Sequence, residues 1–536
     1  MTTMLLQTLT AVAPDINFRL ILPELILSVA GVIVMMVDAF TRRARQRWAT
    51  GAVALAGLAA AAASCVWLWS SPGPRSAFNG MVVLDPMRLS FTLVFIVVAA
   101  LTVLVSMIWV ERESLPAGEF HTLLLFATVG MMLMASGGDL VIIFLGLELL
   151  SIATYVMAGF RKTDLRSNES SMKYFILGSF SSAFLLYGIA LVYGATARTG
   201  PPDASGARRI IAGTTNLEEI ARYLNDGVYP PLLFAGAAML MIGFGFKIAT
   251  APFHVWTPDV YEGAPTPVTA FMAAGPKAAG FASFMRVFLV AFPFVAAAGG
   301  GASVGERLHG AWVGALVVLA VLTMTIGNVV ALVQTNVKRM LAYSSIAHAG
   351  YALVGFVAAG AARGDAAAQS DAVAAVVFYL LAYAVMNLGA FAVVTLIARG
   401  GDRRTAIEDY AGIGFRSPGL AFSLAVFLLS LLGIPLTAGF MGKIVVFREA
   451  INQGYVGLVV VGVLNTAISV YYYLRLIVVM FFRERTTEWQ AARVPASLAL
   501  ALVLTVAGVF YLGIFPGRVL DAFRTGEAQT VVRTSR

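Results

Sequence analysis

The segment GFGFKIATAPFHVW, residues 243–256, places Lys247 inside a long apolar run, followed closely by a proline and a histidine. Three further charged residues lie in similar apolar contexts: Glu148 in LGLELLSIATY (145–155), Lys277 in AAGPKAAGF (273–281) and Lys443 in GFMGKIVVF (439–447). A charge at the centre of a bilayer costs about 2.5–3.5 kcal/mol on insertion scales. Membrane proteins that keep several such charges usually face them inward and move ions with them. The pattern therefore predicts part of a proton or cation pathway.

The composition excludes an ordinary soluble enzyme. Of the 536 residues, 59% are hydrophobic and only 12% are charged, whereas soluble domains have roughly 25% charged residues. The apolar residues fall in runs of about 20 or more, which is long enough to cross a bilayer as helices. The net charge of +9 does not indicate a nucleic-acid partner, because the basic residues lie in short clusters between the apolar runs.

The hydrophobic runs predict an all-α polytopic membrane protein with about fourteen transmembrane helices. The predicted spans are residues 18–40, 48–70, 87–110, 119–136, 139–160, 171–196, 231–260, 266–293, 310–335, 340–360, 371–398, 418–450, 455–482 and 494–515. Asp85 and Asp139 lie near span ends, where we expect caps or interface charges.

Each basic cluster follows an odd-numbered span, so all of these clusters fall on one side of the membrane. They contain Arg42, Arg43, Arg45, Arg47, Arg112, Arg161, Lys162, Lys338, Arg339, Arg399, Arg403, Arg404, Arg483 and Arg485. By the positive-inside rule this side is the cytoplasm, and both termini are predicted on the outer, periplasmic side. The loop 197–230 is an exception, since it carries arginines on the predicted outer face; longer loops depend less on charge for their translocation.

Two spans are predicted to be interrupted. Pro252 lies five residues after Lys247, and Pro435 lies eight residues before Lys443; proline removes a backbone donor and breaks the helical ladder. Broken helices are tolerated in membranes where they line a polar cavity, and they recur in inverted repeats. We therefore predict four segments: a three-helix segment (1–118), two five-helix units (119–293 and 310–482) inverted relative to each other, and a C-terminal helix with its tail (494–536).

The three lysines are the residues best suited to carry protons. A buried lysine can lose its proton, whereas an arginine hardly ever does. We interpret Lys247, Lys277 and Lys443 as proton-carrying stations; the alternative is a static lysine in a buried ion pair. Glu148 is interpreted as a switch that pairs with a lysine and releases it, or as a fixed counter-ion. Its candidate partner is Lys173, although Lys173 is predicted to lie nearer the cytoplasmic end of its span.

Two histidines are further candidates for a proton relay. His254 lies seven residues after Lys247, and His348 lies in AYSSIAHAGY; histidine exchanges protons near neutral pH. The alternative is a hydrogen-bonded structural histidine at each position. Lys338 and Arg339 fit an anchor at the cytoplasmic interface.

The sequence contains no motif for a redox cofactor. It has no GxGxxG fingerprint, no P-loop, no CxxC cluster and a single cysteine, Cys65. We therefore expect no cofactor-binding or metal site on this chain.

Several stretches resemble the antiporter-like membrane subunits of respiratory complex I, the bacterial NADH–quinone oxidoreductase. They are residues 147–194, 243–281, 338–351 and 433–447. The resemblance covers essentially the whole chain and favours the N-type subunits. M-type subunits typically have a glutamate at the position of Lys443, and L-type subunits continue into a long lateral helix.

The resemblance implies a fourteen-helix subunit with an inverted five-helix repeat, in the membrane arm of a proton-translocating enzyme complex in the bacterial inner membrane. It implies that flavin, iron–sulfur clusters and quinone bind to other subunits, and that sister antiporter-like subunits are the partners. The family's functional residues match Glu148, Lys173, Lys247, His254, Lys277 and Lys443.

Two other classes of protein remain open. Subunits of multi-component cation/proton antiporters share the lysine and glutamate pattern but have no redox partner. A purely structural membrane scaffold is the third class, and the insertion cost of the buried charges argues against it.

Overall fold

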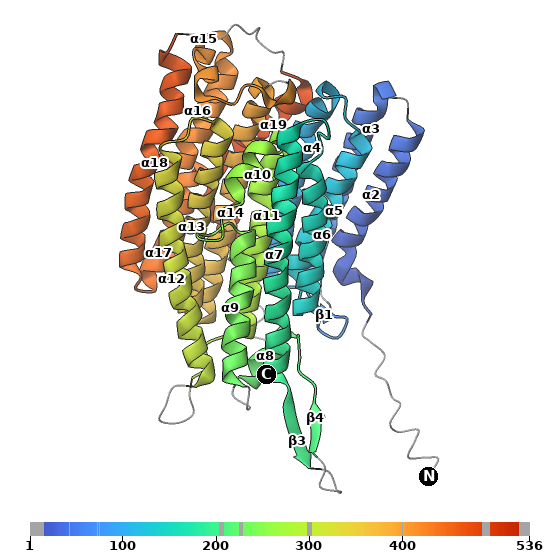
Figure 1. The fold of residues 1–536 in the computed structure, drawn as a ribbon, viewed down its shortest axis with the longest axis vertical. Helices are drawn as coiled ribbons and strands as arrows, with labels where there is room; N and C mark the ends of the chain where they lie inside the picture. The colour runs from blue at the N-terminus through green and yellow to red at the C-terminus, as the bar shows by residue number, and fades with distance from the viewer. Residues whose placement is uncertain are drawn as a thin grey trace.

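In the computed structural model the chain forms a bundle of long, roughly parallel helices (Figure 1). The structure describes residues 16–41, 43–71, 73, 75–202, 208–224, 229–296, 303–398, 400–484 and 494–524. Arg42, Arg399 and Arg485 of the basic clusters lie outside the described residues, as do 1–15 and 525–536 of the two terminal segments. The described part contains nineteen α-helices and two short antiparallel hairpins, so the predicted all-α fold is confirmed.

The first part of the chain builds the elements that precede the first helix break. They are η1 (Phe18–Ile21), α2 (Leu22–Phe40), α3 (Arg43–Ser70), β1 (Ser76–Ala77), β2 (Val82–Val83), α4 (Pro86–Arg112), α5 (Ala117–Ser136), α6 (Leu140–Ala158), α7 (Leu165–Thr196), β3 (Arg198–Pro202), β4 (Arg208–Ile211), α8 (Leu217–Tyr223) and α9 (Pro230–Lys247).

The remaining elements follow that break. They are α10 (Thr257–Gly263), α11 (Thr266–Arg286), the π-helical turn η2 (Val287–Ala291), α12 (Val304–Ala331), α13 (Val337–Ala361), α14 (Ala366–Ala398), η3 (Gly400–Asp402), η4 (Ile407–Tyr410), α15 (Ile413–Arg416), α16 (Pro418–Leu432), α17 (Ala438–Asn452), α18 (Val456–Phe482), α19 (Ala496–Ile514) and α20 (Pro516–Arg524).

Among the described residues, twelve helices are long and apolar enough to cross a membrane. They correspond to twelve of the fourteen predicted spans. The other two predicted spans fall on α11, a 21-residue helix that is less apolar, and on the pair α16 and α17, each of 15 residues. Aspartates cap several helices: Asp85 accepts a hydrogen bond from the backbone of Arg88, and Asp139 accepts one from the backbone of Val141.

Both predicted helix breaks are present. Helix α9 ends at Lys247, and Ile248–Trp256 form turns that contain Pro252 before α10 begins. Helix α16 ends at Leu432, where Gly433 adopts a left-handed conformation (φ 100°), and α17 begins after Thr437. Each break therefore lies next to a lysine, since Lys247 is the last residue of α9 and Lys443 lies in α17.

Helices α11, α13 and α14 form the buried centre of the bundle, and every residue of α11 is buried. Helices α2 and α3 lie at one edge and α18 at the opposite edge (Figure 1). Close backbone approach positions the helices of the site. A Cβ built on Gly130 of α5 lies 2.7 Å from the carbonyl oxygen of Gly146 of α6, so only glycine allows these helices to pack this closely.

Candidate functional site: a row of buried lysines

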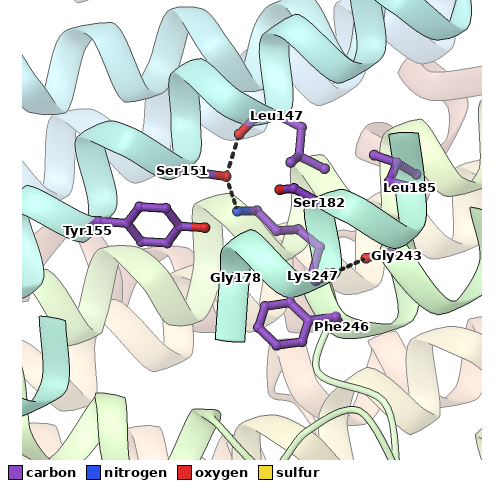
Figure 2. A pocket seen from close by; sticks show the side chains of 10 residues that line it. Leu147, Ser151, Tyr155, Gly178, Ser182, Leu185, Gly243, Phe246 and Lys247 are labelled. Atoms are coloured by element: carbon purple, nitrogen blue, oxygen red, sulfur yellow. Dashed lines mark hydrogen bonds between the residues drawn. The ribbon is translucent and has the colours of Figure 1, made fainter. Parts of the chain in front are cut away.

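The first lysine site lies between α6, α7 and α9 (Figure 2). Lys247 is 5% exposed, and its Nζ donates a hydrogen bond to Ser151 Oγ at 2.8 Å. Ser151 follows Glu148 by three residues, so both belong to one turn of α6. Glu148 in turn accepts a short hydrogen bond from Ser182 of α7. Ser151, Ser182 and Lys247 line the same cavity of about 10 Å³, the space of about one water molecule.

Aromatic rings close one side of this lysine site. The Nζ of Lys247 lies 5.8 Å from the centre of the Tyr174 ring, which is within the range of a cation–π interaction. Tyr174 stacks on Trp256 with ring centres 4.7 Å apart, and Trp256 stacks on Phe246 at 5.2 Å. The stack joins α7 to the segment that follows the helix break.

The second lysine, Lys277, lies on α11 one helical turn before Gly280, which packs against the aliphatic part of the Lys247 side chain. A Cβ built on Gly280 of α11 lies 3.5 Å from Lys247 Cβ and Cγ, and Gly280 follows Lys277 by three residues. Lys277 is 2% exposed. Its Nζ donates to the backbone oxygen of Ser345 at 2.6 Å and also to the Ser345 hydroxyl. The α9–α11 contact thus places Lys247 and Lys277 along one line through the bundle.

One face of α13 continues this line. Ser345, His348 and Tyr351 follow each other at three-residue spacing, so they lie along one side of the helix. His348 Nδ1 lies 2.7 Å from the hydroxyl of Tyr379 in α14, and His348 Nε2 lies 3.3 Å from the hydroxyl of Tyr473 in α18. The predicted relay candidate His348 is therefore held by two phenolic hydroxyls in the buried centre.

The third lysine lies at the far end of this face. Lys443 is 5% exposed and donates to the backbone oxygens of Leu432 at 2.9 Å and Leu431 at 3.3 Å. These carbonyls belong to the end of α16, where the helix break frees them from helical bonding. The Nζ of Lys443 also lies 4.8 Å from the centre of the Tyr351 ring. From Ser345 to Tyr351 the α13 axis rises about 9 Å, so α13 bridges Lys277 and Lys443.

The structure does not place Lys173 in contact with Glu148. Lys173 Nζ lies 2.8 Å from Asp259 Oδ2 and 2.7 Å from Glu169 Oε1. Ser182, the partner of Glu148, follows Lys173 by nine residues on α7, which corresponds to about 13.5 Å along the helix axis. The predicted Glu148–Lys173 pair is therefore absent from this structure, because the two residues lie at different depths of the bundle.

Lys173 instead belongs to a charged group that we call the Asp259 cluster, which consists of Glu169, Lys173, Asp259, Glu262 and Arg339. Arg339 Nη1 lies 2.7 Å from Asp259 Oδ1 and 3.0 Å from Glu262 Oε2. The cluster lines an open cavity of about 300 Å³ beside α10.

A second charged group, the Asp402 cluster, ties the beginning of α13 to three loops. Asp402 Oδ2 lies 3.2 Å from Lys338 Nζ and 3.1 Å from Arg161 Nη2, and it accepts from the backbone of Thr266 at 3.1 Å. Burial of Asp402 raises its pKa, but the charges of Lys338 and Arg161 outweigh this effect and hold the pKa below the usual value of 3.8. Lys338 is thus a buried ion-pair partner that is 1% exposed, in place of the interfacial anchor predicted above.

His254 lies within the turns that follow α9 and is partly buried. Within the described part of the chain its Nδ1 has no hydrogen-bond partner. The described residues also contain no group of three His, Cys, Asp or Glu side chains arranged to hold a metal ion.

Sequence reasoning missed the neutral residues that hold the lysines. Ser151, Ser182, Tyr351, Tyr379 and Tyr473 have no signature of their own, because serines and tyrosines are common in transmembrane helices. A three-residue spacing from a buried charge is a usable signal: Ser151 follows Glu148 at this spacing, and Ser345, His348 and Tyr351 repeat it.

This fold and its lysine row define an antiporter-like transmembrane subunit. Residues 137–469 match the family model described as NADH:quinone oxidoreductase/Mrp antiporter, TM. Within this class the chain belongs to the subunit N family of NADH-quinone oxidoreductase.

Two relatives illustrate this membership. The chain is 46% identical over 508 residues to NADH-quinone oxidoreductase subunit N of Trichlorobacter lovleyi, covering 94% of this chain and 96% of the relative. It is 40% identical over 527 residues to the subunit N of Myxococcus xanthus, covering 94% and 96%.

Solved structures agree with this membership. A chain of respiratory complex I from Thermus thermophilus with bound Aureothin has 34% identity and a TM-score of 0.73, covering 94% of this chain and 100% of that chain. A chain of the Mrp complex from Dietzia sp. has a TM-score of 0.77 at 18% identity, covering 96% and 97%, which shows a shared fold.

Proposed function

We propose that this chain is a proton-translocating membrane-arm subunit of NADH–quinone oxidoreductase, embedded in the bacterial inner membrane. Membership of the subunit N family over nearly the full length supports this assignment. The flavin, iron–sulfur clusters and quinone then belong to other subunits, and the sister antiporter-like subunits are neighbours in the membrane arm. This chain contributes the proton path.

The observation that carries the proposal is the chemistry around the three buried lysines. Lys247, Lys277 and Lys443 donate to serine hydroxyls and backbone carbonyls, and within the described residues none of them pairs with a carboxylate. If a lysine in a tight buried ion pair loses its proton, a buried carboxylate is left unpaired, which costs several kcal/mol. A lysine held by neutral partners avoids that penalty. This supports stations that exchange protons over static ion pairs.

The proposed route follows the buried row. Protons are taken up on the predicted cytoplasmic side near the broken helix α9–α10, where the cavity of the Asp259 cluster opens. They reach Lys247, with His254 or water as an intermediate, and pass to Lys277 along the α9–α11 contact. Ser345, His348 and Tyr351 of α13 line the transfer to Lys443. Lys443 delivers the proton outward or to a neighbouring subunit, so the two inverted five-helix units share one path.

Glu148 is the proposed switch for this path. Its carboxylate accepts from Ser182 and Lys247 donates to Ser151, and both serines line one small cavity. A movement of Glu148 therefore changes the electrostatic cost of the charge on Lys247 without breaking a direct ion pair. In this arrangement Lys173 forms an ion pair with Asp259 near the uptake side. It does not form the direct pair with Glu148 that the sequence predicts.

The cation/proton antiporter is the second candidate. It is favoured by the shared fold with the Mrp complex, but the sequence identity to that structure is 18%, against 34% for the complex I chain.

Co-purification in mild detergent separates the two functions. Recovery with flavin and iron–sulfur subunits and inhibitor-sensitive NADH–quinone reductase activity is the expected result. Recovery with small membrane subunits alone, without redox centres, would favour the antiporter, and sodium-dependent proton exchange would then be the assay.

A further inference from the structure

An apolar groove runs along the surface between α2 and α3, apart from the lysine row. It has a volume of about 480 Å³. Leu25, Val29 and Ile33 of α2 form one wall, and each is at least 38% exposed. Ala56, Gly57 and Ala60 of α3 line the other side. A Cβ built on Gly57 would lie 2.5 Å from Ala30 Cβ, so the two helices touch at this level and close the floor of the groove.

The groove has the length of one bilayer leaflet. Its lining on α2 begins at Leu22 and ends at Ile33, eleven residues later, which corresponds to about 16.5 Å along a helix. The hydrocarbon core of a bilayer is about 30 Å thick, so one leaflet is about 15 Å. A partner transmembrane helix needs the full thickness to pack along its length, whereas an acyl chain needs one leaflet.

A cation lies at the end of the groove. Arg19 precedes Leu22 by three residues, and its guanidinium carbon lies 4.5 Å from the centre of the Trp67 ring. Trp67 follows Ala60 by seven residues and therefore lies on the same side of α3. Tryptophan and arginine are typical of the membrane interface, where headgroups lie. In the described part of the chain no carboxylate pairs with Arg19.

We propose that this groove, with Arg19 at its end, is a binding site for one anionic phospholipid. One acyl chain lies in the groove over Ala56 and Ala60, and the phosphate accepts hydrogen bonds from the Arg19 guanidinium. The planar guanidinium presents paired N–H donors that fit a phosphate oxygen pair. Helices α2 and α3 lie at the edge of the bundle (Figure 1), and the groove residues Leu25, Val29 and Ile33 are exposed there.

Photo-crosslinking tests the site in the complete enzyme complex, reconstituted in vesicles. The probe is phosphatidylglycerol with a diazirine at the end of one acyl chain, and cross-linked peptides are identified by mass spectrometry. We expect labelling of the α2 and α3 peptides that saturates and is competed by unlabelled phosphatidylglycerol. A phosphatidylcholine probe with the same chain should label them less, because it lacks the net negative charge.

Two adjacent alanines provide matched variants. Ala59 and Ala60 are both exposed, but only Ala60 lines the groove. Ala60→Trp fills the groove and should reduce the labelling about tenfold, whereas Ala59→Trp should leave it unchanged. Arg19→Gln should weaken competition by phosphatidylglycerol about tenfold through loss of a charge-assisted hydrogen bond.

Three results would overturn the proposal. The first is labelling that does not saturate or that is spread evenly over the lipid-facing helices. The second is an equal loss of labelling in the two tryptophan variants. The third is labelling of the isolated full chain but not of the complex, which would assign the groove to a helix of a neighbouring subunit.

Discussion

The Nζ of Lys247 donates to Ser151 Oγ at 2.8 Å, one turn of α6 away from Glu148, and Glu148 accepts from Ser182, so two serines of one cavity hold the lysine and the carboxylate without a direct bond between the two charges. Because the lysine is held by a neutral hydroxyl, either protonation state leaves the partner uncharged. The carboxylate is bonded to the other serine and acts on the lysine charge without direct contact. Ser151 therefore positions Lys247, whereas Glu148 controls the cost of its charge. The first two predictions concern Lys247 and Ser151.

Lys247→Ala should reduce proton pumping about tenfold or more, because it removes a positioned proton carrier. The complex should still assemble, since alanine leaves no buried unpaired charge. The measurement is NADH-driven acidification of reconstituted vesicles, normalised to quinone reduction. A normal proton-to-electron ratio in this variant would show that Lys247 is not a proton carrier.

Ser151→Ala should lower pumping while Ser151→Thr largely retains it. The alanine variant removes a hydrogen bond to a charged group, which is worth about 1.5–3 kcal/mol, whereas threonine keeps a hydroxyl at the same position. Comparing the pH profiles of pumping distinguishes this effect from a general loss of packing, because a packing defect changes the rate without moving the profile. Equal profiles in the alanine variant and the wild type would contradict the prediction.

Lys443→Arg should impair pumping about as strongly as Lys443→Ala. Arginine keeps the positive charge near the carbonyls of Leu431 and Leu432, but it does not release its proton under these conditions. Lys162→Arg, at an exposed lysine, is the matched control and should pump normally. Full pumping by Lys443→Arg would show that Lys443 supplies only a fixed charge.

A double-mutant cycle should couple Lys173 to Asp259 and not to Glu148. We expect about 0.5–1 kcal/mol of coupling in unfolding free energy between Lys173→Met and Asp259→Asn, because they remove the two ends of a partly exposed ion pair. Lys173→Met and Glu148→Gln should be additive within about 0.3 kcal/mol. The measurement is denaturant unfolding of the full chain in mixed micelles. Strong coupling between Lys173 and Glu148 would contradict the prediction and support the pair expected from the sequence.

Asp402→Asn should destabilise the protein by about 3–5 kcal/mol at pH 7, since it leaves Lys338 buried without its carboxylate and leaves Arg161 with Asp164 as its ion-pair partner. The folded structure holds the pKa of Asp402 below its usual value. Its stabilisation is therefore present above pH about 4 and is lost as the pH falls through the folded pKa. The difference between wild type and variant, measured as unfolding free energy against pH, should shrink only below pH about 4.

The Asp402 prediction has a direct control. Adding Lys338→Met to Asp402→Asn should recover part of the lost stability, because it removes the buried ammonium that Asp402→Asn leaves unpaired. A constant difference between wild type and Asp402→Asn down to pH 2 would show that the carboxylate does not carry the effect.

The sequence by itself determined the membrane class, the helices and the positions of their breaks. Apolar runs of about 20 residues have one stable form in lipid, and Pro252 and Pro435 mark the two places where that form is interrupted. The sequence also singled out Glu148, Lys247, Lys277 and Lys443, since an insertion cost of several kcal/mol makes each buried charge conspicuous.

Only the tertiary structure decided which partners these charges have. Lys173 bonds to Asp259 from a different helix, and Lys338 bonds to Asp402, which follows it by 64 residues. The serines and tyrosines around the lysine row carry no signal in composition, because a hydroxyl costs little anywhere in a helix. Partners depend on depth in the bundle and on helix rotation, which are set by the packing of glycine faces and of side chains across many helices.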